Sequence, residues 1–269
     1  MPERARELAE LKRIAVATEV AARAAGAAIL AVRESGRADV QRKSDHSPVT
    51  AADLAAHEVL ARALSAILPG VPLLSEEDPE HFTLPTSGPF WVIDPLDGTE
   101  EFIRGGNGFC VNVALCDGTR PVLGVVHVPV VETGFAGVPS DGAWRVRASG
   151  GEEALPGPLR ARAGEQMLVF VSRWHMSRKV EAMRHALPLH VTEVRGAALK
   201  FTALAAGEGH VALGGGGTKI WDTAAGEALL TASGGFLFGP GGHALAAEAP
   251  TWKNPHWMAS GDPALFPAP

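Results

Sequence analysis

One ten-residue run, Trp91–Glu100, constrains the fold of this chain more than any other part of the sequence. An apolar strand ends at Asp94, and a proline and a leucine separate that carboxylate from Asp97. Gly98 and Thr99 then begin a predicted helix, whose first N–H groups have no partners within the helix. Carboxylates beside such donors form a corner where cations and a phosphate group can bind together. The run therefore predicts a strand-to-helix junction that carries a binding site.

The composition is that of a soluble globular protein. With 46% hydrophobic and 20% charged residues, the 269-residue chain can bury one large core or two closely packed lobes. The net charge of −6 argues against a surface for nucleic acid polymers, which requires clustered Lys and Arg. No run of about 18 consecutive apolar residues suggests a membrane span. The N-terminus carries charges of both signs and does not resemble a signal peptide.

The chain has two cysteines, Cys110 and Cys116, and both fall in one predicted strand. Six residues of extended chain cover about 20 Å. That distance is far beyond the roughly 7 Å that separates the Cα atoms of a disulfide. We therefore expect both thiols to be reduced, which favours a cytoplasmic location.

The predicted elements divide into two lobes, residues 1–150 and 151–269. The first lobe begins with a long helix over 4–35 and a second helix from Thr50, where Asp53 gives capping-box spacing. Short turns join its strands, predicted over 71–75, 90–93, 109–116, 122–130, 133–138 and 143–146, which indicates antiparallel hairpins. A segment rich in Gly, Pro and charge at 148–165 marks the boundary. Strands at 167–171, 191–194 and 210–213 then alternate with helices from 177, over 199–206 and from about 222, which favours layered α and β structure.

Four acidic residues occupy positions where predicted elements begin or end: Glu76, Asp94, Asp97 and Asp222. Because strand ends and helix starts gather at one edge of α/β layers, their side chains can converge. Taken singly, Asp97 and Asp222 could equally be helix caps. Two carboxylates about 4 Å apart repel by about 4 kcal/mol at an effective dielectric near 20. A cluster of four therefore needs protons or cations, and Mg²⁺ is the natural partner of oxygen ligands.

These motifs together resemble those of the inositol monophosphatase superfamily, in order and spacing, from the first helix to Gly235. The matching segments are Glu76-Glu77 after a strand, Asp94–Thr99, and Trp221–Gly226. Within the superfamily the chain is most similar to bisphosphate nucleotidases, which remove the 3′-phosphate of 3′-phosphoadenosine 5′-phosphate, on segments 74–78, 112–115, 171–175 and 199–201. The resemblance implies an α+β fold, a layered α-β sandwich (αβαβα) of the inositol monophosphatase and fructose-bisphosphatase type.

The resemblance also implies a metal-dependent phosphoric monoester hydrolase. Two or three Mg²⁺ ions would be held by Glu76, Asp94, Asp97, Asp222 and the main-chain carbonyl of Leu96. The N–H groups of Gly98 and Thr99 would hold the phosphate at a helix N-terminus. A water molecule activated by the metal would be the nucleophile.

By resemblance, the Thr99 hydroxyl and Asp45 form the pair that orients and deprotonates this water, and Glu76 assists. Asp45 lies in a polar connector at 43–50, which we interpret as a mobile loop that closes over a metal. Such loops in the family are associated with inhibition by lithium, so lithium sensitivity is a prediction for this chain.

Three further residues, Ser172, His175 and Lys200, match family positions that contact the nucleotide. The chain departs from the nucleotidase pattern at two places. It has Ala197 where these enzymes usually have Ser, and Gly214 roughly where they have Arg. A lost Arg–phosphate contact weakens the preference for a 5′-phosphate.

Two residues, Arg195 and Lys219, are candidates to replace the missing arginine, and the sequence does not decide between them. It also leaves other functions open. The chain could hydrolyse inositol or sugar monophosphates, bind a phosphate ligand without catalysis, or hold a structural Ca²⁺. In each enzymatic case the partner is a small phosphate monoester, with no nucleic acid polymer and no membrane. A homodimer is possible by analogy with the superfamily.

Overall fold

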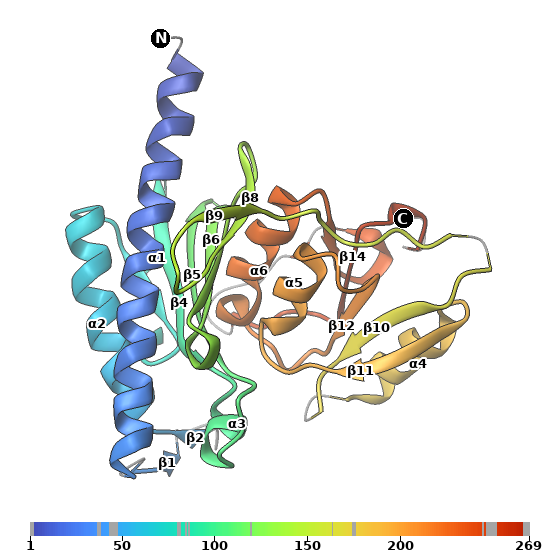
Figure 1. The fold of residues 1–269 in the computed structure, drawn as a ribbon, viewed down its shortest axis with the longest axis horizontal. Helices are drawn as coiled ribbons and strands as arrows, with labels where there is room; N and C mark the ends of the chain where they lie inside the picture. The colour runs from blue at the N-terminus through green and yellow to red at the C-terminus, as the bar shows by residue number, and fades with distance from the viewer. Residues whose placement is uncertain are drawn as a thin grey trace.

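The computed structural model describes residues 3–36, 39–42, 48–79, 82–83, 85, 87–118, 120–162, 164–173, 176–243, 245 and 252–265. Within these residues the elements stack as helices, sheet, helices, sheet and helix, from left to right in Figure 1. The predicted layered αβαβα sandwich is therefore confirmed. The division into two lobes at residue 150 stays a prediction.

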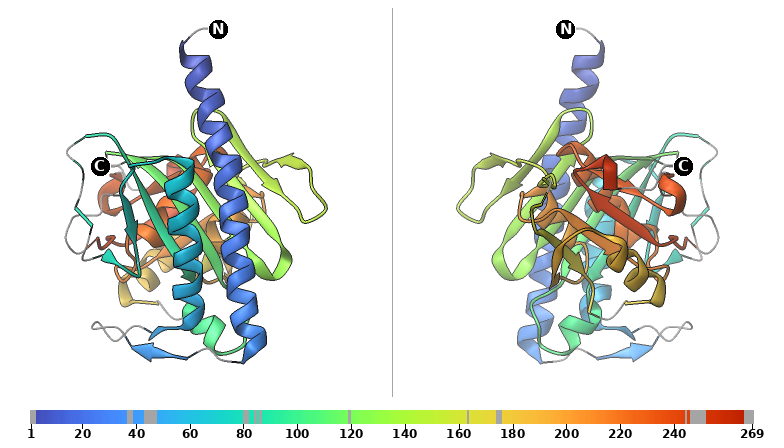
Figure 2. Two further views of the ribbon diagram at one scale, coloured as in Figure 1. Left: turned by 90° about the vertical axis from the view of Figure 1, so that its left-hand side faces the viewer. Right: turned by 90° about the vertical axis from the view of Figure 1, so that its right-hand side faces the viewer.

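The first layer consists of two helices, α1 (Glu3–Ser35) and α2 (Ala51–Ile67), which lie side by side on one face of the first sheet (Figure 2, left). α1 buries alanines at Ala15, Ala22 and Ala25, so its backbone can approach the strands closely. The capping box predicted at the start of α2 is present. The Thr50 hydroxyl accepts from the Ala52 N–H at 3.1 Å, and Asp53 accepts from the Thr50 N–H at 2.8 Å.

By length and composition alone, α1 from Arg4 could also cross a membrane, a property that the sequence analysis did not anticipate. Half of its most apolar stretch is buried in this structure. That stretch also contains Glu19, which is 5% exposed and pairs with Arg23 at 2.9 Å. The contacts of α1 are thus those of a helix packed on a sheet.

The second layer is a seven-stranded sheet of order β3-β4-β5-β6-β7-β8-β9. Its strands are β3 (Leu73–Ser75), β4 (Pro89–Asp97), β5 (Cys110–Asp117), β6 (Arg120–Val128), β7 (Thr133–Val138), β8 (Gly142–Val146) and β9 (Glu152–Ala154). Only the β3–β4 pair is parallel among these strands, and the others form the antiparallel hairpins that the short turns predict. β9 lies inside the predicted boundary segment. Its residues are all exposed, so the sequence contains no apolar pattern from which this strand could be predicted.

The second sheet has five strands in the order β11-β10-β12-β14-β13. They are β10 (Met167–Val171), β11 (His190–Val194), β12 (Val211–Gly214), β13 (Phe236–Phe238) and β14 (Trp257–Ser260). α4 (Arg178–Ala186) packs on its outer face, and α5 (Leu199–Ala205) and α6 (Ile220–Ala232) lie between the two sheets. The remaining elements are short: β1 (Gln41–Arg42), β2 (Pro48–Val49), α3 (Thr99–Ile103), η2 (Pro129–Val131), η3 (Pro240–Gly242) and η4 (Pro263–Leu265).

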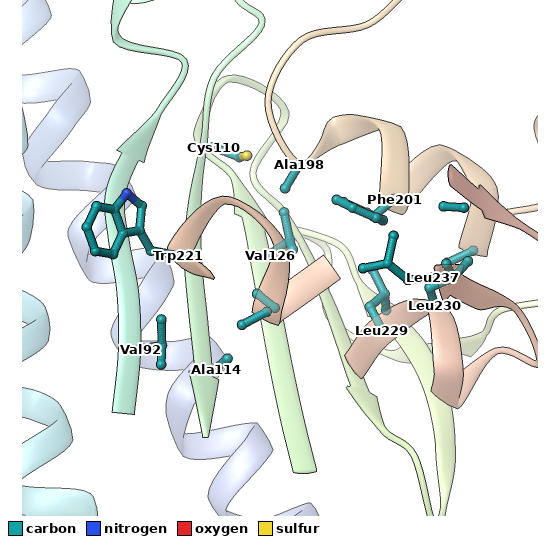
Figure 3. Close-up of a cluster of buried hydrophobic side chains, with 14 of the residues drawn as sticks. Val92, Cys110, Ala114, Val126, Ala198, Phe201, Trp221, Leu229, Leu230 and Leu237 are labelled. Atoms are coloured by element: carbon teal, nitrogen blue, oxygen red, sulfur yellow. The ribbon is translucent and has the colours of Figure 1, made fainter. Parts of the chain in front are cut away.

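The central helix α6 lies directly against the first sheet because two strand residues there are glycine. A Cβ at Gly124 would come within 2.3 Å of the Ala225 carbonyl oxygen, and one at Gly137 within 2.6 Å of the Leu229 Cα. Figure 3 shows side chains of the core that results: Val92, Ala114 and Val126 come from the first sheet, Phe201 from α5, and Trp221, Leu229 and Leu230 from α6. This packing fixes the first turn of α6 near the end of β4.

Both cysteines lie in β5 and are buried and free, as predicted. Burial raises the pKa of the Cys116 thiol to about 12, so this thiol stays protonated at neutral pH.

Candidate metal and phosphate site

Three of the four predicted carboxylates converge on one point. Glu76, Asp94 and Asp222 each offer an oxygen, and the three oxygens lie within 4.8 Å of one another. They come from the turn after β3, from β4 and from the first turn of α6. The Glu76 N–H donates to the Ile93 carbonyl at 3.2 Å, which ties that turn to β4.

The fourth carboxylate, Asp97, lies next to this group but outside it. Its Oδ2 accepts from the Asn112 side chain at 2.9 Å and from the Ala198 N–H at 2.6 Å. Burial raises the pKa of Asp97 to about 6, while these two donors and the nearby Lys200 ammonium oppose the rise. The donors thus fix one oxygen of Asp97 at the edge of the cluster.

The sequence predicts that this strand ends at Asp94, but in the structure β4 continues to Asp97. The pairing of β4 with β5 is interrupted between these two residues by a bulge, where Pro95 has no N–H to donate. The Asp94 Oδ1 accepts from the Leu96 N–H at 3.1 Å inside the bulge. At the bulge the strand changes direction and regular pairing stops. The alternation of apolar residues that marks a strand therefore ends before the strand itself does.

The cluster holds more negative charge than a buried site tolerates. Burial raises the pKa values of both Asp94 and Asp222, and each is raised further by neighbouring carboxylates, among them Glu76 and Asp97. Such a group must take up protons or bind a cation. Because every donor atom is an oxygen, the set fits a hard cation such as Mg²⁺.

A residue that the sequence analysis treated only as a helix cap, Asp53, completes this corner. Its Oδ1 lies 3.3 Å from the Thr99 Oγ1, which also donates toward the Leu96 carbonyl at 3.1 Å. Its Oδ2 accepts from the Thr50 main chain, so Asp53 both caps α2 and contacts Thr99. Asp45, which the resemblance assigned to this role, lies outside the described residues. In the sequence, the capping-box spacing is enough to explain an Asp at position 53. Its second role becomes visible only from its contact with Thr99 in the structure.

A cavity of about 240 Å³ opens onto these groups. Gly98 and Thr99 line it at the start of α3. Gly98 has φ 103°, and a Cβ there would lie 2.7 Å from the Gly108 carbonyl oxygen, so only glycine fits. The helix predicted to begin here is present as α3, which has five residues. If an anion binds at its start, the first N–H groups hold it, because so short a helix has only a small dipole.

Two of the predicted substrate residues, Ser172 and Lys200, meet in the lining of the same cavity. The Lys200 ammonium donates to the Ser172 Oγ at 2.7 Å and to the Ala197 carbonyl at 3.2 Å. Lys200 is 4% exposed, and burial lowers its pKa. The third predicted substrate residue, His175, lies outside the described residues.

The position of the missing arginine is closed by an aromatic ring. A Cβ at Gly214 would lie 2.0 Å from the Trp257 Cε2, and that indole stacks on Phe201 with a centroid distance of 5.0 Å. Of the two candidate replacements, Arg195 bonds Glu193 at 2.6 Å and lines a neighbouring cavity. Lys219 lines the cavity of the carboxylates, with its ammonium 5.1 Å from the Trp221 ring.

Comparison with known proteins agrees with this geometry. Residues 10–263 match the inositol monophosphatase family. The chain is 40% identical over 215 residues to the 3′(2′),5′-bisphosphate nucleotidase CysQ of Escherichia coli K12, covering 79% of this chain and 85% of that protein.

Among solved structures, CysQ from Bacteroides thetaiotaomicron, a bacterial member of the same family, superposes with a TM-score of 0.75 at 28% identity. That match covers 91% of this chain and 96% of the other. The extragenic suppressor protein suhB from Bartonella henselae gives a TM-score of 0.74 at 25% identity, with 91% and 92% covered. The chain therefore belongs to the inositol monophosphatase family and is a phosphatase, that is, a phosphoric monoester hydrolase.

Proposed function

We propose that this phosphatase depends on Mg²⁺ and releases the 3′-phosphate of 3′-phosphoadenosine 5′-phosphate, yielding AMP and phosphate. The observation that carries the proposal is the group formed by Glu76, Asp94 and Asp222, with three carboxylate oxygens within 4.8 Å of one another. This group faces the cavity that Thr99 and Lys200 also line.

The proposed metal ligands are the residues expected from the sequence: Glu76, Asp94, Asp97, Asp222 and the carbonyl of Leu96. When bound, Mg²⁺ supplies positive charge that favours ionisation of the attacking water and stabilises the leaving oxygen. Asn112 and the Ala198 N–H both donate to Oδ2 of Asp97, and we propose that its Oδ1 is the oxygen that binds the cation.

We propose that Thr99 and Asp53 handle the proton of the attacking water, in place of the pair with Asp45. The Thr99 oxygen accepts a proton from the water while its own hydroxyl proton moves to Asp53 Oδ1, 3.3 Å away. The water oxygen forms a bond to phosphorus, and the bond between phosphorus and the 3′ oxygen breaks. The 3′ oxygen takes up a proton from solvent and Asp53 returns its proton to solvent, so charge and atoms balance over the cycle.

The substrate proposal has two supports. The E. coli relative is named a 3′(2′),5′-bisphosphate nucleotidase. In this chain, the buried Lys200 ammonium, which donates to Ser172, provides a positive charge in the cavity for the second phosphate of the substrate. Because Lys219 lines the cavity of the carboxylates and Arg195 lines the neighbouring one, we propose Lys219 as the additional cation.

The test is to identify which phosphate leaves. Wild-type protein with 3′-phosphoadenosine 5′-phosphate and Mg²⁺ is expected to give AMP and no adenosine 3′-phosphate, as separated by chromatography. A Thr99→Ala variant is expected to lose about 100-fold or more in kcat while its melting temperature stays unchanged. Release of the 5′-phosphate, or full activity of the variant, would refute the proposal.

Two further expectations remain proposals. We expect inhibition by lithium, measured as loss of phosphate release in a Li⁺ titration at fixed Mg²⁺. Two free, buried cysteines support a reducing, cytoplasmic setting.

A further inference from the structure

A buried amide from the C-terminal part of the chain holds the loop that presents Asp222. Asn254 is 3% exposed, and its Nδ2 lies 2.6 Å from the Lys219 carbonyl oxygen and 2.9 Å from the Thr223 Oγ1. A third oxygen, the Thr218 Oγ1, lies 3.3 Å away. Asn254 thus links Lys219, three residues before Asp222, to Thr223, the residue that follows it.

The main chain around Asn254 adds further ties to the same loop. The Asn254 N–H donates to the Thr218 carbonyl at 2.8 Å, and the Ile220 N–H donates to the Trp252 carbonyl at 2.9 Å. Trp257 also donates from its Nε1 to the Thr218 Oγ1 at 3.2 Å. The loop before α6 is therefore fastened to the segment 252–257 by both main-chain and side-chain bonds.

These ties reach the carboxylate through one residue, Lys219. Its N–H donates to the Asp222 Oδ2 at 2.7 Å, and its carbonyl accepts from the Asn254 amide. Because Lys219 is held at both its N–H and its carbonyl, one oxygen of Asp222 is held in place. Asp222 offers one carboxylate oxygen to the converging group with Glu76 and Asp94, so the orientation of its carboxylate decides how well the group can hold a cation.

The Asn254 amide acts here as a donor and not as an acceptor. The Asn254 Oδ1 is buried and has no hydrogen-bond partner within the described residues. An unsatisfied buried acceptor lowers stability, and an apolar side chain of similar size would leave no such atom. The donors on Nδ2 are therefore what the amide contributes.

We infer that Asn254 is a positioning residue that orients Asp222 for cation binding. This inference rests on the proposed function, since it takes Asp222 as a ligand of Mg²⁺. Residues that orient metal ligands typically change metal affinity by about 10-fold or more when they are replaced.

The test measures metal affinity directly, by calorimetric titration of Mg²⁺ into chelator-stripped protein. Asn254→Ala is expected to weaken Mg²⁺ binding by about 10-fold. Asn254→Asp is expected to weaken it at least as much, because an acceptor would then face the Lys219 carbonyl. In the Ala variant, Mg²⁺ raised about 10-fold is expected to restore phosphate release.

A matched control is Ser260→Ala on β14. Ser260 is fully buried and donates to the His210 carbonyl at 2.8 Å, away from the cavity. Its replacement is expected to lower the melting temperature and leave Mg²⁺ affinity unchanged. If Asn254→Ala does not fold, Thr223→Val removes one partner of the amide and is expected to weaken Mg²⁺ binding about 3-fold, part of the loss for the full amide.

Unchanged Mg²⁺ affinity in the folded Asn254 variant, or in Thr223→Val, would overturn the inference. So would a loss of affinity in Ser260→Ala equal to that in Asn254→Ala. Failure of the proposed function has a different signature. Wild-type protein would bind Mg²⁺ and lose affinity on Asn254→Ala, yet release no phosphate from 3′-phosphoadenosine 5′-phosphate.

Discussion

Replacing one cluster carboxylate by its amide should stabilise the metal-free protein and remove its response to Mg²⁺. Asp94→Asn is the best choice because Asp94 is 2% exposed and the amide keeps an oxygen that can accept from the Leu96 N–H. At separations within 4.8 Å and an effective dielectric near 20, each carboxylate pair repels by at least about 3.5 kcal/mol. Asp94 takes part in two such pairs.

The gain should be smaller than the sum of the two repulsions, because burial and the neighbouring carboxylates raise the pKa of Asp94 and so favour protonation, which relieves part of the repulsion. We expect Asp94→Asn to be more stable by about 2–4 kcal/mol at pH 8 in chelator, a rise of about 5–10 °C in melting temperature for a chain of this size. Wild-type protein should gain about 2.7 kcal/mol when Mg²⁺ is 100-fold above its dissociation constant. The variant should gain far less.

The assay is thermal unfolding at pH 8, with chelator and with Mg²⁺. Glu101→Gln is a suitable control, because Glu101 is a cavity acid outside the converging group. The reasoning is refuted if Asp94→Asn is less stable than wild type in chelator, or if both proteins gain equally from Mg²⁺.

Three other predictions follow from particular contacts. Asp53→Asn should lower kcat at saturating Mg²⁺ by about 100-fold, because it removes the proton acceptor beside Thr99; a larger loss in Asp45→Asn would show that the resemblance assigned the pair correctly. Burial raises the pKa of Glu227 from 4.5 to about 7. The folded protein therefore loses stability as the pH rises from about 4.5 to 7, because the carboxyl group ionises more readily in the unfolded chain. Glu227→Gln should therefore be more stable than wild type at pH 8 by up to about 3 kcal/mol and equal to it at pH 4, in urea titrations at both pH values; equal stability at pH 8 would contradict this. Gly214→Ala should lose about 1–3 kcal/mol in the same assay because its Cβ meets Trp257, whereas Gly216→Ala, which meets only the edge of His256 at 3.1 Å, should lose far less.

Much of the fold could be predicted because its signals are local. The strand over Met167–Val171 and the capping box at Thr50 depend on residues next to each other in sequence, and both are observed. β13 and β14 were not predicted, since each is three or four residues long and is a strand only because it pairs with a distant partner. β4 was predicted too short because its bulge interrupts the apolar pattern without ending the strand.

The site residues likewise fall into those that local sequence signals predict and those that only contacts between distant residues identify. Glu76, Asp94 and Asp222 were predicted to converge because each follows a strand or begins a helix, and the structure brings them together. Asp53 and Asn254 were missed because their partners lie 46 residues away at Thr99 and 35 at Lys219. The closure of the Gly214 position by Trp257 was also beyond the sequence, as it arises from cross-strand pairing of β12 and β14.

The activity proposed for this site is Mg²⁺-dependent release of the 3′-phosphate of a nucleotide. The most direct test is kcat/KM for phosphate release from 3′-phosphoadenosine 5′-phosphate and from inositol 1-phosphate, each with Mg²⁺ and with chelator. We predict a kcat/KM for the nucleotide at least about 10-fold higher than for inositol 1-phosphate, a difference of about 1.4 kcal/mol in transition-state binding, and no release in chelator. A preference for inositol 1-phosphate, or release that persists without metal, would contradict the account.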